Sequence, residues 1–310
     1  MKGTIRLAAW GVAFLLALVT SAAHALAPDL KSAAVLVIDE ETGEVLYNKN
    51  ADAIVPIASI TKLMTAVVTL DAGLPLDEEV TITAQEVAAT RGAALHSNLT
   101  PGTKLTRAEL LQIALMASEN RAAAALGRTY PGGMDAFVQA MNDKAAQLDM
   151  YDSRFIEPTG LSSSNVSSAG DLAKLVRAAK EYPLVGEYTT RPSATVRIGK
   201  RTVTYVNTNS LVRGGSWEIG LSKTGFIRDA GRCLVMQARL AARSVIIVLL
   251  DSWGKYTRIG DANRIRQWLE AGFAGSATPV RPARTRAGAV QVQHTPSVRA
   301  PSQFEPPQPG

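Results

Sequence analysis

The segment Ser59–Ala72, which reads SITKLMTAVVTLDA, is apolar around most of its circumference when it is wound as an α-helix. Gly73 and Pro75 follow directly, and both are residues that end helices. A helix that is apolar on nearly all sides belongs in the interior of a protein, where other elements cover each of its faces. The rest of this chain therefore has to fold around a central helix.

The segments before and after this helix have different patterns. Two apolar stretches, 33–38 and 45–47, flank a turn that contains Gly43 and predict a β-hairpin. Residues 80–183 are mostly helical in pattern, and one of their helices opens with a capping box, Thr106-x-x-Glu109. The chain thus enters through strands and continues into a helical region.

After Pro183 the pattern changes to strands with glycine-containing turns, and residues 259–272 predict a closing helix. The predicted strands are TVRIGKRTVTYV, EIGLSKTG, RCLVMQARL and SVIIVLLD. We therefore expect an α/β (α+β) fold, in which an antiparallel sheet formed from both chain ends carries helices on its faces and holds an inserted helical subdomain.

The two ends of the chain differ from the part between them. Residues 1–25 carry Lys2 and Arg6, an apolar run and an Ala-His-Ala triplet, which predict a cleaved signal peptide. An uncleaved membrane anchor is the alternative, but the apolar run is short for a membrane span. Residues 276–310 are rich in Pro, Ala, Arg and Gln and predict a disordered tail. The predicted folded domain is therefore 26–275.

The formal net charge of +6 belongs mostly to these two ends, so that residues 26–275 are nearly neutral. A nearly neutral domain gives no reason to expect a nucleic-acid partner. The arginines of the tail fit a solvated charged segment better than a contact with an anionic envelope polymer.

Cysteine and histidine are scarce, which excludes several kinds of site. Cys233 is the one cysteine, so the chain cannot form an internal disulfide, and its strand-like surroundings predict a buried apolar role. The histidines are His24, His96 and His294, and the first and last fall in the predicted signal and tail. One cysteine and one histidine cannot form a closed zinc site, and a serine–histidine triad would have only His96 to use.

Ser59 and Lys62 form the first candidate pair for catalysis. They are three residues apart, so on a helix their side chains share one face and an amine can reach a hydroxyl. A serine becomes a good nucleophile when a neighbouring base takes its proton, and a lysine can act as that base when burial lowers its pKa. The alternative is that Ser59 is a helix N-cap, and Ser252 and Lys255 repeat the same spacing elsewhere.

Two further motifs lie downstream. Ser118-Glu119-Asn120 falls at a junction between two helical runs, where a hydroxyl and an amide can point into a cleft, although a loop at 163–165 repeats its Ser-x-Asn pattern. The motif 223–225, Lys-Thr-Gly, ends a predicted strand. Its lysine and threonine can bind an anion, and its glycine lets a substrate lie close to the strand.

The order SxxK, SxN and KTG is the signature of penicillin-recognising serine enzymes. Around these motifs, the stretches IASITKLMTA, ALMASENRAAAAL, RFIEPTGLS, SKTGF and GRCLVM resemble the low-molecular-mass penicillin-binding proteins that act as D-alanyl-D-alanine peptidases. The resemblance covers most of residues 30–272 and implies the serine β-lactamase/transpeptidase-like fold. Glu119, Glu157 and the stretch GKYTRIGDANRIRQW are most similar to the endopeptidase branch, penicillin-binding protein 7.

The resemblance implies a role for each motif residue. Ser59 attacks a D-alanyl carbonyl to form an acyl-enzyme, and neutral Lys62 takes its proton. Ser118 relays a proton to the leaving amine, and Asn120 holds Lys62 and the substrate amide. Glu119, the middle residue of its motif, receives no catalytic role.

The third motif is implied to bind substrate. Lys223 and Thr224 hold the carboxylate of the released D-centre, and Lys223 is also expected to lower the pKa of Lys62. Backbone N–H groups of Ser59 and Phe226, the residue after Gly225, hold the oxyanion. The resemblance implies penicillin as a covalent inhibitor, peptidoglycan stem peptides as substrates, and no metal or organic cofactor.

Three other functions stay open at this point. A D-alanyl-D-alanine carboxypeptidase differs only in its leaving group, although such enzymes commonly continue into a second domain and an amphipathic membrane anchor. A class A β-lactamase needs a carboxylate for deacylation, and Glu157 is the one candidate. An inactive binding scaffold would keep the cleft but lose turnover. The sequence favours an endopeptidase that is soluble in the periplasm and has no membrane anchor after signal cleavage.

Overall fold

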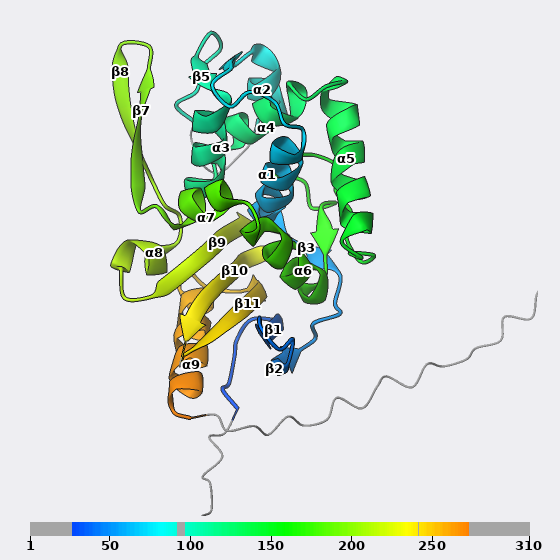
Figure 1. The fold of residues 1–310 in the computed structure, drawn as a ribbon, viewed down its shortest axis with the longest axis vertical. Coiled ribbons are helices and arrows are strands. Elements are labelled where there is room, and N and C mark those ends of the chain that lie inside the picture. The colour runs from blue at the N-terminus through cyan, green and yellow to red at the C-terminus, as the bar shows by residue number, and fades with distance from the viewer. Residues whose placement is uncertain (1–26, 92–96, 241, 273–310) are drawn as a thin grey trace, which may run out of the picture. The chain divides into compact units, whose positions relative to one another are not determined.

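Strands from both ends of the chain pair in one five-stranded antiparallel sheet (Figure 1), in the order β2-β1-β11-β10-β9. The structure is a computed structural model that describes residues 27–91, 97–240 and 242–272. The predicted hairpin and three of the four predicted later strand segments lie in this sheet, and the fold class is confirmed. The strands are β1 (Ala34–Asp39), β2 (Val45–Lys49), β9 (Glu218–Ile227), β10 (Gly231–Leu240) and β11 (Arg243–Ser252).

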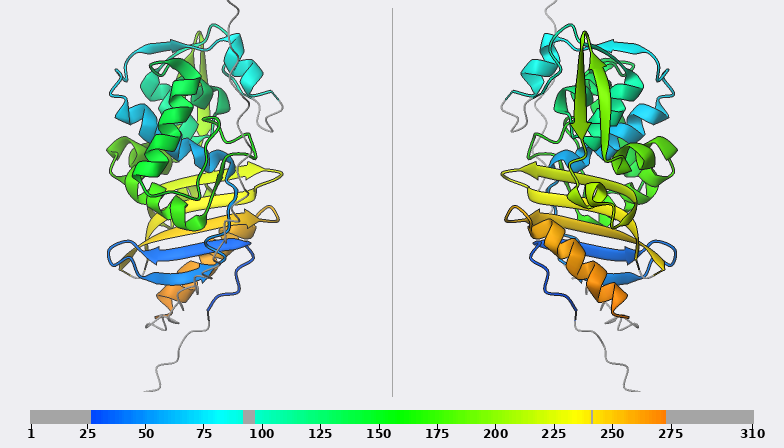
Figure 2. Two further views of the ribbon diagram at one scale, coloured as in Figure 1. Left: turned by 90° about the vertical axis from the view of Figure 1, so that its right-hand side faces the viewer. Right: turned by 90° about the vertical axis from the view of Figure 1, so that its left-hand side faces the viewer.

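Both faces of this sheet are buried, because alternate side chains of each strand point to opposite faces. Val35 and Val37 of β1 lie in the core that includes the closing helix α9 (Thr257–Glu270). Ala34 and Leu36 lie in the larger core on the other face. Figure 2 shows α9 crossing one face of the sheet, with the remaining large helices on the opposite side.

The apolar segment forms the buried central helix that its sequence predicts. The helix α1 spans Thr61–Asp71, its residues 61–69 are buried, and a short 3-10 helix, η1 (Ala58–Ile60), leads directly into it. The regular α-helix thus begins two residues later than predicted. The helices packed around α1 are α3 (Arg107–Met116), α4 (Asn120–Arg128), α5 (Gly133–Gln147) and α6 (Ala169–Lys180).

The capping box that opens α3 is confirmed. The Thr106 hydroxyl accepts a hydrogen bond from the Glu109 backbone N–H at 3.1 Å, and the Glu109 carboxylate accepts one from the Thr106 N–H at 2.8 Å. The short elements of the helical region are β3 (Val55–Pro56), β4 (Glu79–Thr81), α2 (Ala84–Ala89), β5 (Lys104–Thr106), β6 (Val166–Ser167), α7 (Pro183–Thr190) and α8 (Ser210–Gly214).

One predicted strand segment does not join the main sheet. Residues of TVRIGKRTVTYV form a separate hairpin, β7 (Ser193–Ile198) with β8 (Arg201–Val206), which lies beside α3 (Figure 1). The burial pattern explains the difference: Val196, Ile198 and Tyr205 are buried, whereas most of their neighbours along the strands are exposed or half-buried. A hairpin with one apolar stripe packs on a helix instead of entering a sheet that is covered on both faces.

Several predictions concern residues that the structure does not describe. The signal peptide at 1–25, the tail at 276–310 and His96 all lie outside the described residues. Within the described ranges, no helix is long and apolar enough to cross a membrane, and no group of three His, Cys, Asp or Glu residues could hold a metal ion. Cys233 is a free, fully buried cysteine on β10, as predicted.

Candidate active site

The structure brings Ser59 and Lys62 together at the start of the central helix. Lys62 Nζ lies 3.0 Å from Ser59 Oγ. The N-cap positions of η1 and α1 are Ile57 and Ile60, so Ser59 lies inside the helical turn. The interpretation of Ser59 as an N-cap is therefore wrong, and its hydroxyl is directed to the lysine instead.

Lys62 is held by oxygen atoms from three different parts of the chain. In addition to Ser59 Oγ, its Nζ donates to Asn120 Oδ1 at 2.8 Å and to the Thr159 carbonyl at 2.5 Å. The side chain is almost fully buried. Burial lowers the pKa of Lys62 to about 8, while the carboxylates of Glu157 and Glu119 act in the opposite direction. A lysine in this state can give and take a proton near neutral pH.

Ser118 lies where α3 ends and α4 begins, as its sequence position predicts. Its backbone φ is +60°, an uncommon value for a residue other than glycine, and this turns the hydroxyl toward the sheet. The Ser118 hydroxyl accepts a hydrogen bond from Lys223 Nζ at 3.0 Å. The second and third motifs are therefore in direct contact.

Lys223 on β9 is as deeply buried as Lys62. Burial lowers its pKa well below the usual value for lysine, and the charges of Lys62 and Arg258 lower it further. Repulsion between the two ammonium groups acts on both, so Lys62 and Lys223 disfavour each other's charged form in addition to the effect of burial. A bound carboxylate would supply the opposite charge and favour the charged form of Lys223.

The other members of the third motif have distinct surroundings. The Thr224 hydroxyl lies 2.6 Å from that of Thr208, which sequence reasoning did not single out. Gly225 packs against the turn before Ser59: a Cβ at this position would come within 2.9 Å of the Ile57 carbonyl oxygen and 3.2 Å of the Ser59 nitrogen. The glycine thus lets β9 approach the serine turn, a contact that its sequence did not indicate.

Arg258 supports this end of β9 and was also missed. It stands in α9, far from the motifs in sequence, and donates to the carbonyl oxygens of Gly225 at 2.8 Å and Cys233 at 3.1 Å. The only hint in the sequence was its place in a stretch similar to the endopeptidase branch.

The loop with the sequence EPTGLS holds the other side of the serine turn. The Glu157 carboxylate accepts hydrogen bonds from the backbone N–H groups of Thr159, at 2.6 Å, and Gly160, at 2.7 Å, and from the Asn165 side chain at 3.0 Å. These bonds position the Thr159 carbonyl that contacts Lys62. Glu157 therefore organises a loop, and its two oxygens are already engaged.

Two other segments repeat the spacing of a motif, namely 252–255 and 163–165, and their residues stabilise the fold instead of lining the active site. Ser252 Oγ lies 2.5 Å from Ser32 Oγ in a buried contact that ties the chain before β1 to the end of β11. Asn165, from the second Ser-x-Asn pattern, is fully buried and holds Glu157 and Thr61. Neither repeat contributes to the Ser59 groove.

A groove of about 690 Å³ contains the Ser59 side chain and is lined by residues of all three motifs. Phe226 stands at its edge with 47% of its surface exposed, and the Arg232 guanidinium lies over its ring at 4.4 Å from the centroid. The other predicted residues that line it are Ser118, Asn120, Thr224 and Gly225, while Lys62 and Lys223 lie beneath it.

A hydroxyl next to a buried lysine of lowered pKa, in a groove with a second buried lysine, is a site for acyl transfer through a serine–lysine pair. The comparisons with known proteins agree with this class of enzyme. The family model described as D-alanyl-D-alanine carboxypeptidase matches residues 20–254. The chain belongs to this peptidase family, and the predicted resemblance is confirmed.

Relatives and solved structures extend the match. A D-alanyl-D-alanine endopeptidase of Pseudomonas aeruginosa is 50% identical over 246 residues, which cover 79% of each chain. The D-alanyl-D-alanine endopeptidase of Escherichia coli is 45% identical over 247 residues, again 79% of each chain. The DD-transpeptidase of Streptomyces K15 has a TM-score of 0.74 and 28% identity, with 79% of this chain and 98% of that chain covered.

We predict that Gly160→Ala slows the acylation of Ser59 by a penicillin roughly 100-fold, because an error of about 1 Å in the position of a reacting group has an effect of that size. A Cβ on Gly160 would lie 2.0 Å from the Ala58 carbonyl oxygen, so the serine turn has to move. The rate is measured with a fluorescent penicillin. Gly199→Ala is the matched control, since Gly199 also has a positive φ but faces open space. Acylation of Gly160→Ala at the wild-type rate would show that the turn tolerates displacement.

Proposed function

We propose that this protein is a serine D,D-peptidase that hydrolyses the D-alanyl–diaminopimelate cross-link of peptidoglycan through an acyl-enzyme on Ser59. The observation that carries the proposal is the 3.0 Å contact between Ser59 Oγ and Lys62 Nζ, with Lys62 buried and its pKa lowered to about 8. A base of this pKa is neutral in a useful fraction of molecules at physiological pH.

In the acylation step, neutral Lys62 takes the proton of Ser59 as Oγ attacks the D-alanyl carbonyl carbon. The negative charge that develops on the carbonyl oxygen is held by the backbone N–H groups of Ser59 and Phe226. When the C–N bond breaks, Ser118 passes a proton to the leaving amine and receives the proton that Lys62 took from Ser59, so that Lys62 is neutral again. Lys62 then takes a proton from the water that attacks the ester and passes it to Ser59 Oγ as the ester C–O bond breaks. The free D-alanyl acid loses its proton to solvent, and Ser59, Lys62 and Ser118 are restored.

The substrate is positioned by groups on both sides of the serine. The Asn120 amide holds Lys62 through its oxygen, and among the described residues no hydrogen bond occupies its nitrogen, which can donate to the substrate carbonyl. Lys223 and Thr224 bind the carboxylate on the D-centre that leaves. This assignment is supported by the contact of Lys223 with Ser118, since the proton donor and the anion site then meet the same leaving group.

The endopeptidase function is favoured over a carboxypeptidase because the relatives at 50% and 45% identity are named endopeptidases. The class A β-lactamase function is not favoured. The one candidate carboxylate for its deacylation, Glu157, accepts bonds from backbone N–H groups and from Asn165. An inactive scaffold is not favoured either, because the serine–lysine contact is intact.

We further propose that the enzyme works in the periplasm, where peptidoglycan stem peptides and β-lactam antibiotics are accessible. The pattern of residues 1–25 supports export through a cleaved signal peptide. We predict that the protein expressed from the full sequence is recovered from the periplasmic fraction with Leu26 as its first residue, as read by mass spectrometry of the intact chain. Recovery from the membrane fraction with residues 1–25 retained would instead identify an anchor.

We predict that the purified enzyme splits a defined cross-linked muropeptide dimer into monomers, and that Ser59→Ala does not. The reason is that removal of Oγ leaves no nucleophile for the acyl-enzyme, so the rate should fall at least about 10⁴-fold. Products are separated by chromatography and identified by mass spectrometry, beside a pentapeptide monomer. Release of free D-alanine from the pentapeptide while the dimer stays intact would assign the enzyme to the carboxypeptidases.

We predict that the acylation rate constant at saturating penicillin rises about tenfold between pH 7 and pH 9. With a pKa of about 8, Lys62 is mostly charged at pH 7 and mostly neutral at pH 9, and only the neutral amine can accept the serine proton. The rate is followed by stopped-flow fluorescence, under conditions where binding does not limit it. A rate that stays constant or falls across this range would exclude Lys62 as the base.

A further inference from the structure

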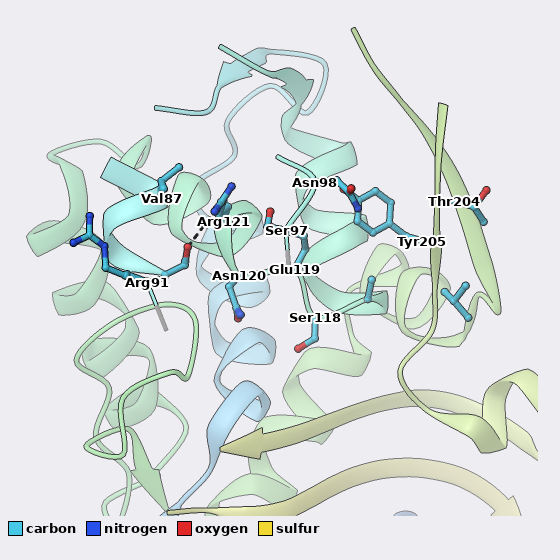
Figure 3. Close-up of a pocket in the computed structure, with 13 residues that line it drawn as sticks. Val87, Arg91, Ser97, Asn98, Ser118, Glu119, Asn120, Arg121, Thr204 and Tyr205 are labelled. Atoms are coloured by element: carbon cyan, nitrogen blue, oxygen red, sulfur yellow. Dashed lines mark hydrogen bonds between the residues drawn. The ribbon is translucent and has the colours of Figure 1, made fainter. Parts of the chain in front are cut away.

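A second pocket lies directly beside the Ser59 groove. It has a volume of about 440 Å³ and lies between residues 118–121, where the chain enters α4, and strand β8 (Figure 3). Arg91, Ser118 and Asn120 line both this pocket and the groove, so a ligand can extend from one to the other. We name it the Glu119–Tyr205 pocket after two of its buried residues.

Neither of these two side chains has a role in the chemistry described above. Tyr205 projects from β8 toward the turn that carries Glu119 (Figure 3), and only 8% of its surface is exposed. Within the described residues its hydroxyl has no hydrogen-bond partner. A buried hydroxyl without a partner is uncommon in a native protein and calls for a ligand or an ordered water.

Glu119 supplies the complementary chemistry. Its Oε2 caps α4 by accepting the Ala122 N–H at 2.5 Å, and the residue is 7% exposed. Burial raises the pKa of the Glu119 carboxyl, although hydrogen bonds from Ser97 and Ala122 oppose the rise. Tyr205 and Glu119 together thus offer a hydroxyl donor without a partner and a carboxylate acceptor, which is the pattern that an amide group, with its C=O and N–H, can satisfy.

The pocket is on the side of the groove where the leaving group departs. Ser118, which lines it, contacts the anion-binding Lys223. Strand β8, which supplies Tyr205, continues into Thr208, and Thr208 contacts Thr224. A leaving group whose carboxylate is held by Lys223 and Thr224 therefore has its side chain close to the pocket opening.

From this placement we propose that the Glu119–Tyr205 pocket binds the side arm of the leaving diamino acid. The Tyr205 hydroxyl donates to the carbonyl, and Glu119 accepts from the N–H, of the amide at the far end of that arm. A free D-alanine leaving group has only a methyl side chain and cannot reach this pocket. The pocket therefore favours a cross-link over a terminal D-alanine, an inference that rests on the proposed endopeptidase function.

The test compares kcat/KM for a cross-linked muropeptide dimer with kcat/KM for a pentapeptide monomer. Tyr205→Phe removes one hydroxyl and Glu119→Gln keeps an oxygen for the cap of α4. We expect each to lower the dimer-to-pentapeptide ratio by about 5- to 10-fold, the usual effect of one hydrogen bond. Loss of the Glu119 charge also changes the protonation of Lys62, but this acts on both substrates alike and cancels in the ratio.

Tyr130→Phe is the matched control, because Tyr130 packs on Phe137 outside both pockets and its variant should leave the ratio unchanged. Penicillin acylation of Ser59 reports whether each variant is folded. If the wild type splits the dimer and the ratio stays constant in Tyr205→Phe and Glu119→Gln, the inference is overturned and the proposed function stands. Equal losses on both substrates would also overturn it.

A wild type that does not split the dimer would refute the proposed function, and binding would then decide the inference. Calorimetry on Ser59→Ala measures the affinities for the dimer and the pentapeptide. If Ser59→Ala binds the dimer more tightly than the pentapeptide, and the double variant with Tyr205→Phe does not, the proposed role of the pocket is supported. Equal affinity for the two peptides would overturn it.

Discussion

The burial of the Lys62 amine is the constraint on which the rest of the site depends. A charged ammonium group in an apolar interior is strongly disfavoured, and the protein responds in two ways. It lowers the pKa to about 8, and it surrounds Nζ with oxygens from Ser59, Asn120 and Thr159. Lys62 is buried because it stands in a helix that is apolar on nearly every side and therefore lies in the interior. The central position of α1 thus lowers the pKa of the lysine as well as filling the core.

The turn before this helix is held in an unusual conformation by close packing from two sides. Ala58 has a φ of +48°, a value that costs about 1–3 kcal/mol for a residue other than glycine and persists only where the surroundings enforce it. Gly160 presses on this turn from the EPTGLS loop, and Gly225 presses on it from β9. Both glycines are needed because any Cβ would collide with the backbone of the turn. The strain at Ala58 is thus maintained by two segments that are distant in sequence.

The sequence predicted those features that depend on local spacing or on a motif. The contact of Ser59 with Lys62 follows from their separation of three residues, and the capping box of Thr106 follows from its own signature. Features that depend on contacts between distant segments were not predictable in this way. Arg258 reaches β9 from the last helix, and no local pattern indicates this. The hairpin that carries Tyr205 alternates apolar and polar residues, as a strand of the main sheet also can. Its place outside that sheet depends on its packing against α3, which no local pattern indicates. Gly225 was correctly singled out, but its neighbour proved to be the serine turn.

The Ser118–Asn120 turn connects catalysis with the recognition of the leaving group. Figure 3 shows Ser118 and Asn120 directed toward the sheet, while Glu119 between them lies beside Ser97 in the second pocket. The carboxylate of Glu119 also raises the pKa of Lys62. Glu119 therefore caps α4, lines the second pocket and acts on the pKa of Lys62. A single acidic residue thus links the recognition side of the turn to its catalytic side.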